Sequence, residues 1–192
     1  MRKAVKIETF EDMSQHMIRF LKGEIPESPC HMGELEDETK PYVAPLVAMN
    51  VLGFVTMCSQ PGLRKRELLQ RSYVVGLARE EVAMRLYDVV NLTGMIAMAY
   101  KISDLDVPRV GLEPDRTGAV VVTLEDDRHF TFVGRYGFEL CWWERAGMTK
   151  AAMKKLAAEL WELTLIDPVW GRDPMDRDGL FMACLEIARP KP

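Results

Sequence analysis

The sequence lacks a hydrophobic run long enough to cross a membrane. Its longest apolar stretches, residues 46–55 and 95–100, fall well short of the about 20 residues that a membrane-spanning helix needs. Three basic residues near the amino end are followed by acidic residues. A secretory signal has an apolar stretch at that place. The sequence therefore predicts a cytoplasmic protein with no membrane partner.

Cysteine and histidine are scarce and widely spaced. No two cysteines have the spacing of a zinc knuckle or a redox dithiol, and no two of the three histidines have a helical ligand spacing. The sequence thus predicts no metal site. Because no other feature indicates secretion, buried thiols are favoured over disulfides. The four thiols concerned are Cys30, Cys58, Cys141 and Cys184.

The chain also lacks an excess of basic charge. Lys and Arg number 25 against 29 Asp and Glu, which gives a formal net charge of −4. A protein that binds duplex nucleic acid usually presents a basic field to the phosphates. No duplex nucleic acid partner is therefore predicted. A local basic patch would still be compatible with this composition.

Common catalytic signatures are missing as well. The sequence contains no nucleophile elbow, no Walker loop and no dinucleotide-binding glycine pattern. The acidic loop at residues 173–179 resembles half of a calcium loop, but Pro174 and Leu185 fall where oxygen ligands are required. We expect no cofactor, and no catalytic residue can be named. Whether the chain is an enzyme stays open.

The periodic segments that are present indicate one globular domain over residues 1–192. Apolar residues recur at helical spacing in the segment that begins after Thr9, a good N-cap residue, and in three others. A shorter helix is predicted around two adjacent tryptophans. The predicted helices cover residues 10–22, a stretch after the acidic run 34–38, 79–91, 138–146 and 150–164.

Strand signals alternate with these helices. The chain 59–62 reads Ser-Gln-Pro-Gly and predicts a type II turn, in which Gly62 takes a positive φ. A polar turn between two short apolar runs predicts a hairpin at residues 119–134. The fold class expected is α+β, a mixed and mostly antiparallel sheet of about six strands covered by about four helices. The predicted strands are 54–58, 69–77, 95–102, 119–124, 129–134 and 180–188.

Residues 50–76 concentrate the side chains most suited to ligand binding. Turn amides and a serine hydroxyl can bind anionic oxygens, arginines can form charge-assisted bonds, and a tyrosine can stack on a base. The alternative is an ordinary hairpin whose charged loop is merely solvated. The candidate ligand-binding residues are Ser59, Gln60, Gly62, Arg64, Arg71 and Tyr73.

The same region carries a resemblance. The stretch 53–62 reads GF-x-T-x-x-SQPG, and residues 70–76 read QR-x-x-V-x-G. These motifs resemble an uncharacterised domain family that occurs in actinobacteria and in viral genomes, over roughly the first half of the chain. The family has no assigned activity, so the resemblance implies no reaction. It does favour a ligand role for Ser59, Gln60, Arg71 and Tyr73.

Trp142 and Trp143 form a second candidate surface. Adjacent side chains diverge on a helix or a strand, so these two cannot both enter one core. One of them is expected at a subunit contact or a ligand surface, or partly covered by the loop after residue 134.

Three classes of function follow from these features. The first is a non-catalytic protein that binds or sequesters a nucleotide or another phosphate-bearing small ligand, as a viral anti-defence protein would. The second is an enzyme that acts on a nucleotide-like metabolite. The third is a protein–protein interaction module or inhibitor that uses the tryptophan surface. A homo-oligomer is expected from the general frequency of oligomers.

The first hypothesis predicts that nucleotides raise the melting temperature, because a ligand that binds only the native state stabilises it. Arg71→Ala should abolish this shift in thermal denaturation. A shift of the same size in the variant would contradict a nucleotide pocket at Arg71.

Overall fold

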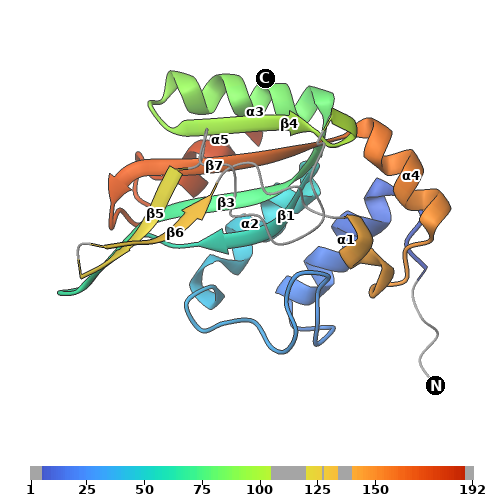
Figure 1. The fold of residues 1–192 in the computed structure, drawn as a ribbon, viewed down its shortest axis with the longest axis horizontal. Coiled ribbons are helices and arrows are strands. Elements are labelled where there is room, and N and C mark those ends of the chain that lie inside the picture. The colour runs from blue at the N-terminus through green and yellow to red at the C-terminus, as the bar shows by residue number, and fades with distance from the viewer. Residues whose placement is uncertain (1–5, 105–119, 127, 134–139, 189–192) are drawn as a thin grey trace.

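A computed structural model describes residues 6–104, 120–126, 128–133 and 140–188 of the chain. Figure 1 shows helices on both sides of one twisted sheet. The helices are α1 (Phe10–Leu21), α2 (Val43–Val51), α3 (Glu80–Leu92), α4 (Lys150–Glu159) and α5 (Leu180–Ala188). Short 3-10 helices are η1 (Lys40–Tyr42), η2 (Ile102–Asp104) and η3 (Leu140–Glu144). The strands are β1 (Phe54–Gln60), β2 (Leu63–Arg64), β3 (Leu68–Arg79), β4 (Ile96–Lys101), β5 (Val120–Glu125), β6 (Arg128–Val133) and β7 (Leu160–Trp170).

The long strand β3 is the centre of the sheet. One of its edges pairs with β1 and β2, and the other pairs with β7 and β5. Strand β4 adds to the far edge of β7, and β6 adds to β5. All of these pairings are antiparallel, and β3 and β4 run parallel to each other with β7 between them. The predicted α+β class and the predicted β5–β6 hairpin are confirmed.

Two sequence-based predictions are wrong at the carboxyl end. The helix predicted to reach residue 164 ends at Glu159, and β7 follows at once. Because β7 is paired on both edges and covered on both faces, it is almost continuously apolar. Its sequence therefore lacks the alternation of apolar and polar residues by which a strand is recognised. The strand predicted at 180–188 is helix α5. A nine-residue apolar run is ambiguous by period, and here it covers one face of the sheet.

The two faces of the sheet carry separate hydrophobic cores. Helices α1 and α4 cover one face, where α1 contributes Phe10 and Met13 and α4 contributes Leu156. Helices α2, α3 and α5 cover the other face, as Leu46 and Phe181 illustrate. Successive β3 side chains enter opposite cores because strand side chains alternate. Tyr73, Val75 and Leu77 face α1, whereas Val74 and Ala78 face α5.

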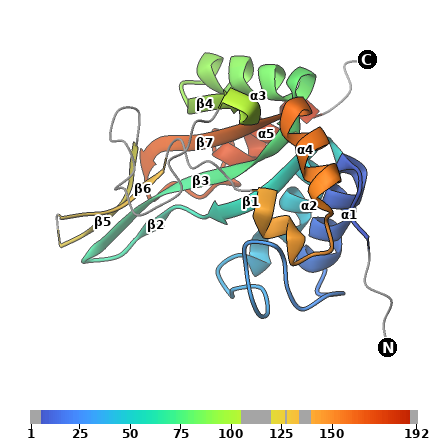
Figure 2. The ribbon, with the colours of Figure 1, turned by 45° about the vertical axis from the view of Figure 1, so that its right-hand side comes forward.

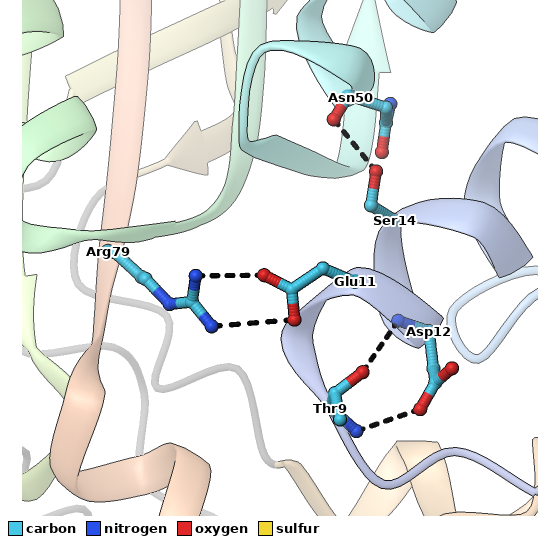
Figure 3. Close-up of polar contacts among 6 residues, drawn as sticks. All are labelled: Thr9, Glu11, Asp12, Ser14, Asn50 and Arg79. Atoms are coloured by element: carbon cyan, nitrogen blue, oxygen red, sulfur yellow. Dashed lines mark hydrogen bonds and ion pairs between the residues drawn. The ribbon is translucent and has the colours of Figure 1, made fainter.

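Helix α1 is fixed to the end of β3 (Figure 3). Its N-cap is a capping box, in which the Asp12 amide donates to Thr9 Oγ1 at 3.1 Å and the Thr9 amide donates to Asp12 Oδ2 at 2.9 Å. One residue along, Glu11 Oε1 lies 2.8 Å from Arg79 Nη1. These contacts confirm the predicted N-cap and set the position of the helix against the sheet.

A buried polar chain then joins α1, α2 and β1. Ser14 Oγ donates to the carbonyl oxygen of Asn50 at 2.8 Å (Figure 3). The Asn50 side chain in turn donates to Thr56 Oγ1 at 2.8 Å and to the Leu46 carbonyl at 2.9 Å. Since Asn50 is 1% exposed, these two bonds satisfy its side-chain NH2 group in place of water, whereas Oδ1 has no partner among the described residues. They hold both helices against one end of β1.

Gly76 gives a stability test of the β1–β3 pairing. A Cβ added there would lie 2.4 Å from the Val55 carbonyl oxygen and 2.8 Å from Phe54 Cε2. Because the first neighbour is backbone, Gly76→Ala should lower the free energy of unfolding by about 1–3 kcal/mol in urea denaturation. The control Gly23→Asn has open space and a left-handed φ that Asn tolerates, so its stability should stay near the original. Equal stability of Gly76→Ala and the unaltered chain would contradict this packing.

Candidate functional site

A cavity of about 310 Å³ opens beside β1. Five consecutive residues of β1, 56–60, form one wall, and the end of α1 with Phe20 and Leu21 forms another. The loop between α1 and α2 closes a third side with residues such as Cys30 and Leu35. Figure 2 shows β1 at the lower margin of the sheet, with this blue loop below it. We call this cavity the β1 pocket.

Local bonds shape the loop wall of the β1 pocket. The His31 amide donates to Ser28 Oγ at 3.1 Å, and the His31 ring Nε2 lies 2.9 Å from the Glu34 carbonyl oxygen. The His31 ring also lies against Phe20, with the ring centroids 5.8 Å apart. The loop therefore presents its apolar side chains inward without a helix or strand of its own.

Two thiols line the β1 pocket, those of Cys30 and Cys58. Burial raises the pKa of Cys30 well above its ordinary range, and the neighbouring Cys58 thiol raises it further. Cys58 is exposed as a residue, but the protein atoms around its thiol also raise its pKa by desolvation. The Tyr73 hydroxyl, 3.7 Å from Cys58 Sγ, acts in the opposite direction. Both thiols are therefore protonated at neutral pH, which is unsuitable for a cysteine nucleophile.

The charged groups of the β1 pocket are acidic. Glu36 and Glu38 lie at its mouth, and Glu36 is 68% exposed and 3.9 Å from His31 Nε2. The described part of the chain places no Lys or Arg in the lining. The walls are otherwise mostly apolar. The pocket thus suits a largely apolar ligand that offers a few hydrogen-bonding groups.

The structure brings together three of the six candidate residues. Ser59, Gln60 and Tyr73 line the β1 pocket. Gly62, Arg64 and Arg71 do not line it, and Arg64 is exposed on β2. The loop wall at residues 28–39 was missed, because it carries no periodic pattern and no motif that marks it as part of a site.

The turn after β1 differs from the sequence-based prediction. Ser59 and Gln60 belong to β1, and Gly62 has no positive φ, so the predicted type II turn is wrong. Gly62 is required for a different reason. A Cβ there would lie 1.9 Å from the Arg172 carbonyl oxygen, so the turn packs directly on the chain that follows β7.

Gln70, the first residue of the QR segment, has a structural role. Its side-chain amide donates to the Pro61 carbonyl at 2.6 Å and to Gln60 Oε1 at 3.1 Å. Its own carbonyl accepts from the Gly171 amide at 2.9 Å. The Gln70 side chain thus holds the Pro61 turn, and its backbone holds the end of β7. These motif residues position the edge of the β1 pocket.

Arg71 makes structural contacts outside the β1 pocket. Its guanidinium lies 4.2 Å from the centroid of the Trp170 ring and donates from Nη1 to the Val121 carbonyl at 3.0 Å. Nearby, Asp167 is fully buried and its Oδ2 lies 3.5 Å from Arg172 Nε. Burial raises the pKa of Asp167, whereas both arginines lower it. The arginine of the motif therefore joins β3, β5 and β7.

The two tryptophans diverge as predicted. Trp143 is fully buried, and its ring meets the His16 ring at a centroid distance of 5.9 Å. Trp142 is 41% exposed and lines the β1 pocket. The candidate surface around the pair therefore reduces to Trp142, next to the pocket rather than at a separate patch.

Hydrogen bonds within the acidic loop after β7 stabilise its conformation. Asp173 Oδ1 accepts from the Met175 amide at 2.8 Å, and the Asp173 carbonyl accepts from the Asp176 amide at 3.0 Å. Across the residues placed in the structure, no three His, Cys, Asp or Glu side chains gather as metal ligands. In the same residues, no helix is both long and apolar enough to span a bilayer.

The fold and the pocket define a class: an α+β domain with an antiparallel sheet and a cavity beside an edge strand. A family model described as a domain of unknown function (DUF6919) matches residues 3–181. The chain belongs to this family, and the match extends well beyond the first half that the motifs indicated. No curated protein sequence matches the chain.

The raised thiol pKa values give a chemical test of the β1 pocket. At pH 8, iodoacetamide should alkylate Cys58 more slowly than free cysteine, and the rate should rise with pH as thiolate forms. Tyr73→Phe removes a bond that lowers the pKa of Cys58, so it should slow labelling further. Peptide mapping by mass spectrometry measures the rate at each cysteine, and urea-unfolded protein is the control. Faster labelling of native Cys58 than of the unfolded chain would contradict this environment.

Proposed function

We propose that the protein is a non-catalytic binding protein that holds a small ligand in the β1 pocket. The observation that carries this proposal is the pocket itself, which combines a volume of about 310 Å³, apolar walls and a few polar groups. Ligand pockets in proteins have this size and composition. Ser59, Gln60 and Tyr73 are the candidate residues positioned to contact the ligand.

The nature of the walls bears on the kind of ligand. A phosphate group needs a cationic partner or a cluster of amides. Arg64 and Arg71 lie outside the lining, and Glu36 and Glu38 at the mouth would repel phosphate. We therefore favour a largely apolar ligand that is uncharged or cationic. A nucleotide is the alternative, and the experiment below distinguishes the two kinds of ligand.

A thermal-denaturation panel tests the proposal. Metabolites, including nucleotides, are screened for an increase in melting temperature, which a ligand at about 100 times its Kd produces by adding about 2.7 kcal/mol. Cys58→Phe fills the pocket and should abolish the shift given by each active compound. The control Val51→Phe adds the same ring at an exposed site on α2 and should preserve the shift.

Two results would overturn the proposal. One is that neither a compound of the panel nor a short peptide stabilises the protein. The other is a shift that survives Cys58→Phe but is lost in Arg71→Ala, which would place the ligand near Arg71 and favour a phosphate-bearing molecule. Active compounds are also incubated with the protein and recovered by chromatography. Intact recovery is expected, whereas a product would favour the enzyme alternative.

A further inference from the structure

The β1 pocket has an unusual wall, because it follows the edge of a strand. All five residues 56–60 line it, although the side chains of a strand alternate between two faces and only one register shift, between Thr56 and Cys58, interrupts the β1–β3 pairing. Met57 and Val55 belong to the core under α1, whereas Thr56 bonds to Asn50 on the other face. A cavity reached by residues of both faces must border the strand edge itself, where backbone groups lie.

That edge has no partner in the described part of the chain. β1 pairs with β3 along one side only, and no further backbone hydrogen bond reaches residues 54–60. Along its second side, alternate N–H and C=O groups therefore point away from the sheet. Residues 56–60 of this strand line the β1 pocket.

A row of alternating donors and acceptors is matched best by another backbone. An extended peptide presents N–H and C=O groups at the same spacing and can add to a sheet edge as a new strand. The part of β1 that borders the pocket is five residues long, about 16 Å at strand spacing, with Thr56 and Met57 buried and residues 58–60 accessible. Apolar side chains of such a peptide would meet Phe20 and Leu35, which line the pocket.

Charge at the mouth narrows the class of peptide. Glu38 has no ion-pair partner among the residues that the structure places, and the neighbouring Lys40 is paired with Asp37 at 2.6 Å. The Glu36 carboxylate pairs with the His31 ring, at 3.9 Å. A basic residue at one end of the peptide would meet both carboxylates.

From this geometry we infer that the ligand of the β1 pocket is a short extended peptide segment, apolar with a basic residue, that adds to β1 as an antiparallel or parallel edge strand. The inference rests on the proposed function and specifies the ligand of the same pocket. The unpaired N–H and C=O groups of the β1 edge support the inference, and the two carboxylates at the mouth of the pocket indicate that the peptide is positively charged.

Peptides with methylated amides test the backbone pairing. A library of acetylated, amidated pentapeptides with one lysine is screened by fluorescence polarisation, and the strongest binder is remade with N-methyl groups at odd or at even amides. In an added strand only alternate amides face β1. One methylated set should therefore bind about tenfold more weakly per lost bond, and the other should bind as before. Equal affinity of the two sets would overturn the inference.

Charge variants and hydrogen exchange locate the peptide. Glu36→Gln with Glu38→Gln should weaken binding about two- to fivefold, whereas Glu80→Gln with Glu81→Gln on α3 changes the same charge away from the pocket and should have no effect. The bound peptide should slow amide exchange in residues 56–60. Protection of a different edge strand, such as β4, would overturn the inference. It would also be overturned if β1 became protected in the free protein as the protein concentration rises, because the occupant would then be a second copy of the chain.

The failure of this inference can be distinguished from that of the proposed function. If compounds of the metabolite panel bind in a Cys58-dependent manner and no peptide does, the peptide inference is wrong and the binding function stands. If neither compounds nor peptides bind, both are wrong.

Discussion

The rest of the structure depends on the pairing of β3 along both of its edges. Residues 73–78 of β3 bond to β1 on one side and to β7 on the other. Val74, Leu77 and Ala78 are fully buried, so a shift of one residue would exchange the two hydrophobic faces. Gly76 lets the Phe54 ring and the β1 backbone approach at the middle of this pairing. The central strand therefore fixes the register of the whole sheet.

The β1 pocket follows from that arrangement. β1 is tied to β3 on one side, and the Ser14–Asn50–Thr56 chain of bonds holds α1 and α2 against one end of it. On the side of β1 away from β3, residues 56–60 border the cavity and not a second strand. Gln70 and Gly62 hold the turn that ends β1. The SQPG and QR segments of the chain thus build the scaffold of the pocket, and only part of them lines the cavity.

Local signals made several elements predictable. Thr9 begins α1 because its side chain and that of Asp12 satisfy each other's backbone amides, an interaction visible in four residues of sequence. The β5–β6 hairpin was likewise predictable from a polar turn between two apolar runs. Tertiary contacts decided the other elements. Leu160 to Leu165 continue the apolar pattern of α4 yet form strand β7, because pairing with both β3 and β4 outweighs helical propensity.

The candidate site was predictable to the extent that side chains follow strand geometry. Gln60 and Tyr73 are cross-strand neighbours in the β1–β3 pairing, so the same strand geometry brings both to the pocket. Arg71, only two residues from Tyr73, is turned toward Trp170 at a register shift in the β3–β7 pairing, which no sequence pattern marks. The loop wall around Cys30 and His31 depends on contacts with α1, such as that between the His31 and Phe20 rings, which no periodic pattern marks.

The central claim is that a ligand occupies the β1 pocket, and mapping amide chemical shifts by NMR tests it most directly. Titrating a compound that raises the melting temperature should shift the amides of residues 56–60 and of the loop at 28–39. The amides around Arg71 and Trp170 should stay in place. Shifts confined to Arg71, Trp170 and their neighbours, with none along β1, would contradict the account.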